Sequence, residues 1–94
     1  MIVVRDVFQA KYGKGGELVQ LFKDGFAEWE MTNARILTDA SGQFFTVVTE
    51  LEYTDLADWQ ANFAKIMEQP TFGEWFSKME PLVLTGSREF FNIE

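Results

Sequence analysis

The apolar and polar side chains from Gln43 to Tyr53 divide between two different faces of an extended chain, and this stretch is predicted to be the central strand of the fold. It is rich in β-branched and aromatic residues, and turn-forming residues bound it at both ends. One face is apolar except for a threonine and should pack against helices: Phe45, Val47, Thr49, Leu51 and Tyr53. The opposite face carries Phe44, Thr46, Val48, Glu50 and Glu52. Because that second face is apolar at one end and charged at the other, we expect it to border a partly polar space.

Around this strand the pattern predicts three further strands and three helices. Apolar residues recur at helical spacing in two amphipathic segments, and a shorter helix follows them. Asp55 with Asp58, and Thr71 with Glu74, have the spacing of N-terminal capping boxes. The predicted elements are strands at 2–10, 33–40, 43–53 and 82–93, and helices at 16–31, from 55 to before Pro70, and from 71 to Pro81.

Glycines mark three positions where the backbone is expected to be unusual. The turn at residues 12–16, Y-G-K-G-G, lacks the spacing of a phosphate-binding loop and is interpreted as a flexible strand-to-helix turn. Gly25 costs the first helix about 1 kcal/mol relative to alanine, so we expect the helix to approach the sheet closely there. Gly86 marks an expected bend or bulge in the last strand.

The element order is that of two split strand-helix-strand units. It predicts a single α+β domain over residues 1–94: a ferredoxin-like βαββαβ fold with a four-stranded antiparallel sheet and all helices on one face. The other face should then be covered by a second copy of the chain, which closes an α/β barrel. The apolar side chains expected on that face are Ile2, Val4, Phe8, Phe44, Val48, Leu82, Leu84 and Phe90. Both faces of the first and last strands are apolar, so the pattern leaves their phase open.

Composition supports association of the chain with itself and excludes several functions. Aromatic residues make up 16% of a chain too short to bury them all, which favours a homodimer. The net charge of −7 disfavours nucleic acid as a partner. No apolar run is long enough to span a membrane and no signal-type segment is apparent, so we expect a soluble, cytoplasmic protein. With no His and no Cys, the chain lacks an imidazole base, a thiol nucleophile and an ordinary zinc or haem ligand set, so no metal or cofactor is expected.

Several polar side chains are candidates for a ligand pocket, each with a structural alternative. Glu50 and Glu52 share a strand face and could divide acid and base roles. Alternatively, the two carboxylates could sit at a solvated strand end or pair with Arg5, Arg35 or Arg88 across the sheet. Arg5 and Arg88 could bind a carboxylate or phenolate, or form cross-strand or intersubunit salt bridges. The full set of pocket candidates is Arg5, Phe44, Thr46, Glu50, Trp59, Asn62 and Arg88. Trp59 and Asn62 lie three apart on one helix and could reach the same site, although Trp59 also fits the core and Asn62 also fits a surface position at the edge of that face. Trp75 and Phe76 could form a pocket lid or pack in the core.

The chain resembles the dimeric α/β-barrel superfamily, and within it the small antibiotic-biosynthesis-monooxygenase and NIPSNAP-like domains. The resemblance covers nearly the whole chain. It rests on the element order and on K-Y-G-K-G at 11–15, E-L-V-Q-L-F at 17–22, T-V-V-T-E-L-E at 46–52 and R-E-F-F-N-I-E at 88–94. It implies a pocket for a small, often aromatic molecule between sheet and helices or inside the barrel. The haem-degrading branch uses a histidine that this chain lacks. The cofactor-free monooxygenase branch uses Asn, Trp, Tyr and Arg groups; Asn62, Trp59 and Arg88 are of these types, but no motif aligns them with those roles.

Three functional hypotheses follow from these patterns. The first is a homodimeric domain that binds a small organic molecule, with aromatic compounds among the candidates. The second is a cofactor-independent monooxygenase or isomerase acting on an aromatic or polyketide-like substrate. The third is a dimerisation module without a ligand. A cavity of roughly 300 Å³ or more with Arg5 or Arg88 pointing into it would favour the first two.

Overall fold

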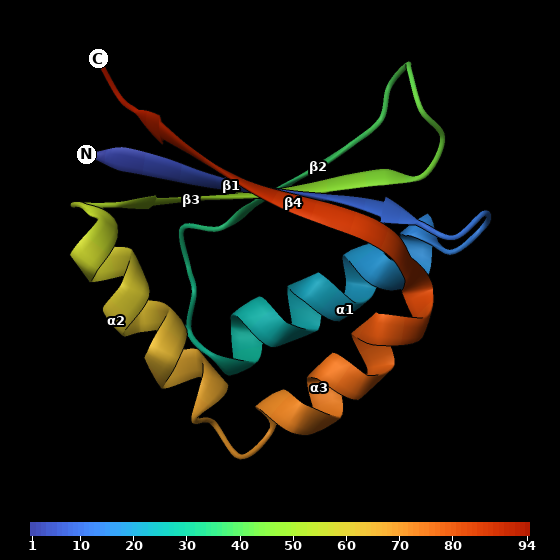
Figure 1. Ribbon diagram of the computed structural model, residues 1–94. Helices are drawn as coiled ribbons and strands as arrows, with labels where there is room; N and C mark the ends of the chain where they lie inside the picture. The colour runs from blue at the N-terminus through green and yellow to red at the C-terminus, as the bar shows by residue number, and fades with distance from the viewer.

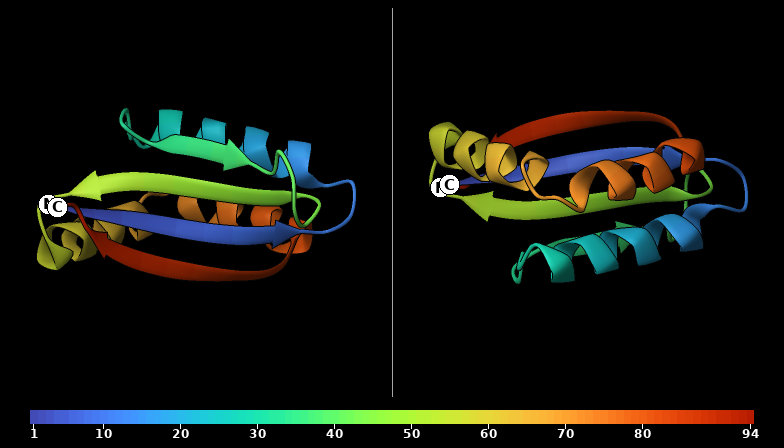
Figure 2. Two further views of the ribbon diagram at one scale, coloured as in Figure 1. Left: turned by 90° about the horizontal axis from the view of Figure 1, so that it is seen from above. Right: turned by 90° about the horizontal axis from the view of Figure 1, so that it is seen from below.

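The computed structural model describes all 94 residues and shows the element order expected from the sequence. The sheet is antiparallel, and all three helices lie on one side of it, as Figures 1 and 2 show. The elements are β1 (Ile2–Ala10), α1 (Gly15–Glu28), β2 (Arg35–Thr38), β3 (Thr46–Tyr53), α2 (Leu56–Met67), α3 (Phe72–Met79), a 3-10 turn (Glu80–Leu82) and β4 (Val83–Asn92). The predicted ferredoxin-like fold class is therefore confirmed.

The strand order is β2-β3-β1-β4, so the two long central strands are β1 and β3. The register pairs Arg5 with Glu50 and Glu89, and Asp6 with Thr49 and Arg88. Residues paired in this way share a face of the sheet. Odd-numbered positions of β1 therefore face away from the helices, and even-numbered positions face toward them. The chain ends lie side by side, because β4 returns antiparallel along β1 (Figure 1).

The structure decides the phase of the first and last strands, which the sequence left open, and it places four of the side chains expected on the open face on the helix side instead. Ile2, Val4 and Phe8 lie on the helix side: Ile2 and Val4 are buried, and the Phe8 ring packs 5.0 Å from Phe22 of α1. Phe90 lies on the same side, 5.0 Å from Trp59. The open face instead carries Val3 and Val7 of β1, Leu37 of β2, Val48 of β3 and Phe91 of β4. Both phases of these strands are apolar, so only contact with the helices could distinguish them.

The core lies where α1 crosses the sheet. Leu18 and Val47 are almost completely inaccessible, and Phe22 and Ala10 complete the buried cluster. For the predicted central strand, this confirms that Val47 faces the helices. The helices are amphipathic and short, and none is long and apolar enough to cross a bilayer.

Two element boundaries differ from the expected ones because a residue adopts a left-handed backbone conformation. Phe45 has φ 59°, so the third strand begins at Thr46 and not at Gln43. Glu30 has φ 57° and ends α1 at Glu28, short of the predicted residue 31. The backbone N–H of Met31 donates to the carbonyl of Phe26 at 2.8 Å, and that of Glu30 donates to Ala27 at 3.3 Å, which is the Schellman pattern.

One of the two expected capping boxes forms. Asp55 accepts a hydrogen bond from the backbone N–H of Asp58 at 2.8 Å, and Asp58 accepts one from Thr54 at 3.0 Å. Thr71 does not cap α3, so that prediction was wrong. Its hydroxyl accepts a hydrogen bond from the indole N–H of Trp29 at 3.1 Å instead. A tertiary contact therefore replaces the local one.

Gly25 has a different role from the one expected, whereas the irregularity expected at Gly86 lies just before it in β4. A Cβ on Gly25 would lie 2.7 Å from Nε1 of Trp75, so this glycine permits close packing of α1 against α3 and not against the sheet. A Cβ on Gly86 would lie 3.1 Å from the ring of Phe8. The irregularity of β4 lies next to it, where the register shifts between Gln9 and Ala10.

Candidate functional site

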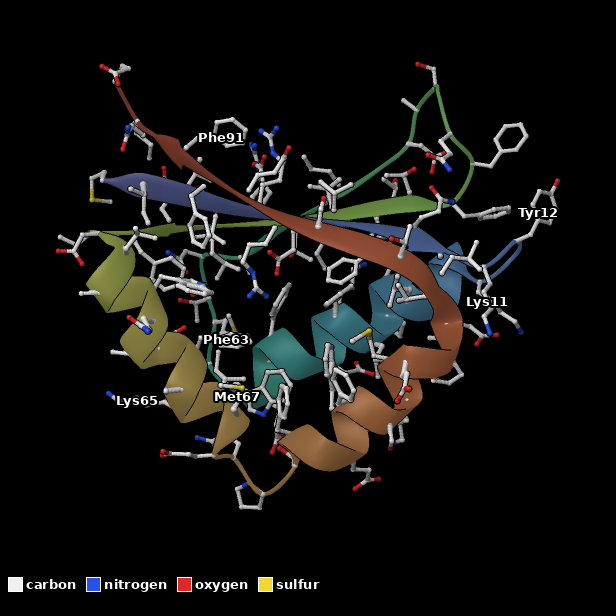
Figure 3. All side chains as sticks on the ribbon, in the orientation of Figure 1. Lys11, Tyr12, Phe63, Lys65, Met67 and Phe91 are labelled. Atoms are coloured by element: carbon white, nitrogen blue, oxygen red, sulfur yellow. The ribbon has the colours of Figure 1, made fainter.

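An apolar cavity of about 300 Å³ lies between the helices and the sheet. We call it the aromatic pocket. All but one of its 12 lining residues are hydrophobic: Phe8, Phe22, Phe26, Trp29, Met31, Phe63, Ile66, Phe72, Trp75, Phe76, Met79 and the exception, Arg88. Figure 3 shows Phe63 of α2 directed into the space between the layers. A cavity of this size and lining suits a small ring compound.

The helical repeat places the pocket's aromatic side chains. Phe22, Phe26 and Trp29 follow one another at intervals of four and three residues on α1, so they share one face. Trp75 of α3 packs against that face, with its ring centre 5.5 Å from Phe22 and 5.2 Å from Trp29. Its indole N–H donates to the carbonyl of Leu21 at 2.8 Å. The polar atom of Trp75 is thus satisfied, and its ring is held as a rigid wall.

Arg88 supplies the only charge that lines the aromatic pocket. Its Nε donates to Oδ1 of Asp6 at 2.7 Å and its Nη2 donates to Oδ2 at 3.1 Å, in the two-pronged geometry typical of arginine and carboxylate. The guanidinium carbon also lies 4.8 Å from the ring centre of Phe63 and 5.1 Å from that of Trp59. Asp6 therefore neutralises Arg88, and two aromatic rings cover the guanidinium.

Trp59 and Asn62 come together with Arg88 on the helix side of the sheet, although neither lines the aromatic pocket itself. The hydroxyl of Tyr53 donates to Oδ1 of Asn62 at 2.8 Å, which ties α2 to the end of β3. Burial raises the pKa of Tyr53, and the nearby carboxylates of Asp58 and Asp6 raise it further. Tyr53 therefore remains a neutral hydrogen-bond donor at physiological pH.

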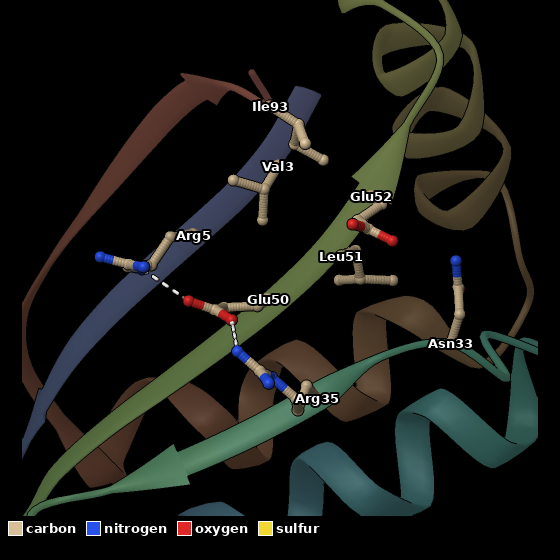
Figure 4. A pocket seen from close by; sticks show the side chains of 8 residues that line it. All are labelled: Val3, Arg5, Asn33, Arg35, Glu50, Leu51, Glu52 and Ile93. Atoms are coloured by element: carbon tan, nitrogen blue, oxygen red, sulfur yellow. Dashed lines mark hydrogen bonds and ion pairs between the residues drawn. The ribbon is translucent and has the colours of Figure 1, made fainter. Parts of the chain in front are cut away.

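Arg5 and Glu50 lie on the opposite side of the sheet, in a second recess of about 400 Å³ that we call the open-face recess. As Figure 4 shows, Glu50 stands between two arginines from its neighbouring strands. It accepts from Nε of Arg5 at 2.7 Å and from Nη2 of Arg35 at 2.5 Å. The hydrogen bond from Arg35 holds the pKa of Glu50 below its usual value, against the opposing effect of burial, and Arg5 adds to the lowering. This is the cross-sheet ion pair anticipated as the alternative to acid-base chemistry.

Phe44 and Thr46 lie at a third place, next to the first turn of α1. They line a recess of about 460 Å³ together with Gly15 and Lys23. Thr46 donates to Oε1 of Gln9 at 3.2 Å, whereas the Phe44 ring is largely exposed. The structure thus distributes the seven candidate residues over three places: Arg5 and Glu50 in the open-face recess, Phe44 and Thr46 beside α1, and Trp59, Asn62 and Arg88 on the helix side.

Sequence reasoning missed the residues that form most of the aromatic pocket. Phe22, Phe26 and Phe63 fit a helical core pattern, and nothing in that pattern distinguishes a filled core from one that encloses a cavity. Trp75 and Phe76, expected as either a lid or core, do line the pocket. The density of aromatic residues on α1 and α3 was the available signal, because large rigid rings fill a small core incompletely.

The fold is shared with two groups of solved structures. A NIPSNAP domain protein from Burkholderia xenovorans superposes with a TM-score of 0.86 at 20% identity, covering 100% of this chain and 95% of that one. A NIPSNAP family protein from Agrobacterium tumefaciens has a TM-score of 0.86 at 16% identity, covering 97% and 90%. SnoaB, a cofactor-independent oxygenase from Streptomyces nogalater, has a TM-score of 0.72 at 16% identity, covering 99% and 92%.

These neighbours confirm, as a likeness of fold, the resemblance to NIPSNAP-like and antibiotic-biosynthesis-monooxygenase-like domains. No protein-family model matches the chain, and no curated protein matches it either. The likeness is therefore one of architecture, and the site must be argued from its own residues.

Proposed function

We propose that this protein binds a small, uncharged or weakly acidic ring compound in the aromatic pocket. The observation that carries the proposal is a cavity of about 300 Å³ with 11 hydrophobic residues among its 12 lining residues. Such a lining favours an apolar ligand through burial of its surface, at roughly 25 cal/mol per Å². The rings of Trp29, Phe63 and Trp75 offer edges and faces for stacking.

The charge state of the pocket argues for an uncharged ligand. Asp6 occupies two donors of Arg88, and the pair is partly withdrawn from water, with the two side chains 20% and 35% exposed. A ligand carboxylate would have to compete with Asp6 or bring an unpaired charge beside it, which is costly in an apolar site. A phenol avoids that cost and can still accept or donate one hydrogen bond.

Calorimetric titration with naphthalene, 1-naphthol and 1-naphthoate tests this proposal, because the three ligands share a ring system and differ in charge. We expect 1-naphthol to bind and 1-naphthoate to bind at least tenfold more weakly. Met31→Trp should abolish binding by filling the pocket. Met67→Trp places the same side chain at an exposed position on α2 and is the matched control. Failure of all three ligands to bind would refute the proposal and favour the ligand-free dimerisation module.

Cofactor-independent oxygenation or isomerisation is the second candidate. It is favoured by one local observation: Tyr53, Asn62 and Trp59, which can donate hydrogen bonds or stack, lie beside Arg88 at the edge of the pocket. A phenol held there would have the side-chain amide N–H of Asn62 and the remaining N–H groups of Arg88 as hydrogen-bond donors to its oxygen. SnoaB, which shares the fold, is a cofactor-independent oxygenase.

Oxygen consumption with a panel of phenols and anthrones separates this enzyme from a simple binding protein. The oxygenase would be supported if turnover is lost in Arg88→Met and in Asn62→Ala. Lys65→Met, on the same helix as Asn62, is the control and should keep turnover. If every substrate tested binds tightly and none is turned over, binding remains as the only function supported.

We further propose that the protein is a homodimer in which the open faces of two sheets meet. Eleven large apolar side chains remain exposed in the single chain. Leu37 and Phe91 are among them and lie on the open face. Exposed apolar surface of this kind marks a contact with a partner.

Sedimentation at micromolar concentration tests the dimer. Leu37→Glu should convert it to monomers, whereas Leu56→Glu, which places the same charge at an exposed position on α2, should leave the dimer intact. A wild-type protein that sediments as a single chain would exclude the barrel.

A further inference from the structure

The open-face recess contains polar groups that the fold does not consume. Glu50 is 8% exposed and each of its two oxygens already accepts a hydrogen bond from an arginine. Each guanidinium uses only one of its N–H groups in this contact, out of the five that arginine carries. The remaining donors of Arg5 and Arg35 have no protein acceptor. Two guanidiniums that share one carboxylate therefore leave one positive charge and a set of free donors.

Glu52 places a negative charge at the other end of the same recess. It follows Glu50 by two residues on β3, so it lies on the same face, about 6.5 to 7 Å further along the strand. Glu52 is exposed and forms no salt bridge or hydrogen bond through its side chain. The four charged groups, Arg5, Arg35, Glu50 and Glu52, sum to zero. A simple anion would be attracted at one end of the recess and repelled at the other.

A ligand with a carboxylate and an ammonium on neighbouring atoms fits this arrangement of charges. Each end can form a charge-assisted hydrogen bond of about 2.7 to 2.9 Å, the carboxylate with the arginines and the ammonium group with Glu52. Val3 pairs with Glu52 in the sheet register and Ile93 lies beside it, so an apolar wall stands next to the negative end (Figure 4). An aliphatic side chain on the ligand could rest there.

We propose that the open-face recess binds a zwitterionic, amino-acid-like molecule, whose carboxylate contacts Arg5 and Arg35 and whose ammonium group contacts Glu52. The site is separate from the aromatic pocket, because the sheet lies between them. All of its residues belong to one chain, so it does not require a second copy. In a dimer closed over the open face, the recess lies between the two sheets, and the bound molecule would be enclosed there.

Titration of the full chain with three related ligands tests this site. L-Leucine carries both charges, 4-methylpentanoate has the same carbon chain without the ammonium, and isopentylamine lacks the carboxylate. We expect millimolar or tighter binding of leucine, detected by calorimetry and by shifts of backbone amide signals in β1 and β3. Each of the other two should bind at least tenfold more weakly.

Two variants assign the roles within the recess. Arg35→Gln should weaken leucine binding tenfold or more, and Glu52→Gln should remove the preference for leucine over 4-methylpentanoate. Glu52 is exposed and unpaired, so its variant is expected to fold even if loss of Arg35 destabilises the sheet. Lys78→Gln, at an exposed position on α3, is the control and should leave binding unchanged.

Three results would overturn the proposal: no binding of leucine at 10 mM, equal binding of leucine and 4-methylpentanoate, or leucine binding that persists unchanged in both variants. Ligands of the aromatic pocket are titrated separately, so failure of one site leaves the other testable.

Discussion

Arg88 of β4 and Asp6 of β1 lie opposite each other in the sheet and are joined by two hydrogen bonds, at 2.7 and 3.1 Å, at the edge of the aromatic pocket. The pair is partly buried, so removing one partner leaves the other with an unmet charge. We expect Asp6→Asn to lower the free energy of unfolding by about 1 to 2 kcal/mol. This is less than the loss expected on breaking a fully buried pair, because water partly solvates the charge that is left.

A double-mutant cycle measured by urea denaturation isolates this interaction. Arg88→Met keeps the length of the side chain and removes its charge. The double variant should be more stable than the sum of the two single effects predicts, by about 1 kcal/mol. Additive effects would mean that the two side chains contribute independently. In ligand titrations, Asp6→Asn should also improve the binding of 1-naphthoate, because Arg88 would then be free to pair with it.

Gly25 is expected to tolerate no side chain. Alanine is favoured over glycine inside a helix by about 1 kcal/mol, but its Cβ would lie 2.7 Å from Nε1 of Trp75 and 3.0 Å from the ring of Trp29. Gly25→Ala should therefore destabilise the protein by about 1 to 3 kcal/mol in spite of its better helix propensity. Gly16→Ala is the matched control on the same helix, because a Cβ at that position would have no other atom within 4 Å. It should be neutral or stabilising in thermal denaturation.

Glu30 is the left-handed residue that ends α1, and glycine should be preferred there. Glu30→Gly relieves the cost of a side chain at φ 57° and should raise the free energy of unfolding by about 0.5 to 1 kcal/mol. Glu30→Gln keeps the side chain and removes only the negative charge at the helix C-terminus, so it measures the dipole contribution. If both variants give the same increase, charge and not backbone conformation limits stability at this position.

Glu50 should make stability depend on pH in the acid range. Its pKa is lowered in the folded protein, chiefly by the hydrogen bond from Arg35, so the folded state binds a proton less readily than the unfolded chain. The stabilising contribution of ionised Glu50 to the free energy of unfolding is therefore present at pH values above the usual carboxyl pKa, and it is lost as the pH falls below about 4.5. Urea midpoints measured across that range should fall less steeply in Glu50→Gln than in the wild type. Glu74→Gln removes one negative charge from an exposed pair and controls for net charge.

Local patterns along the chain were sufficient to predict most of the architecture. The alternation in β3 correctly placed Val47 toward the helices and Glu50 toward the open face, because β3 has one clearly apolar face. The Asp55 cap was predictable because its partners lie within four residues. Where both faces of a strand are apolar, as in β1, the pattern did not indicate which face packs against the helices.

The aromatic pocket shows the opposite case. Phe22, Phe63 and Trp75 come from three helices, and each alone fits an ordinary core position. Whether such rings meet and fill the space, or stand apart and enclose a cavity, depends on how closely the helices approach. Gly25 sets part of that approach, and its role depends on Trp75, which lies 50 residues away in the chain.

The sequence by itself determined the order of strands and helices, the antiparallel sheet and the mixed character of the face that carries Glu50, because these depend on side-chain periodicity and on turns between near neighbours. Only the tertiary structure decided that Arg88 pairs with Asp6 on the helix side, and that Arg5 and Arg35 share Glu50 on the other. Those pairings depend on strand register and phase, which are set by the packing of whole elements and not by any short stretch of chain.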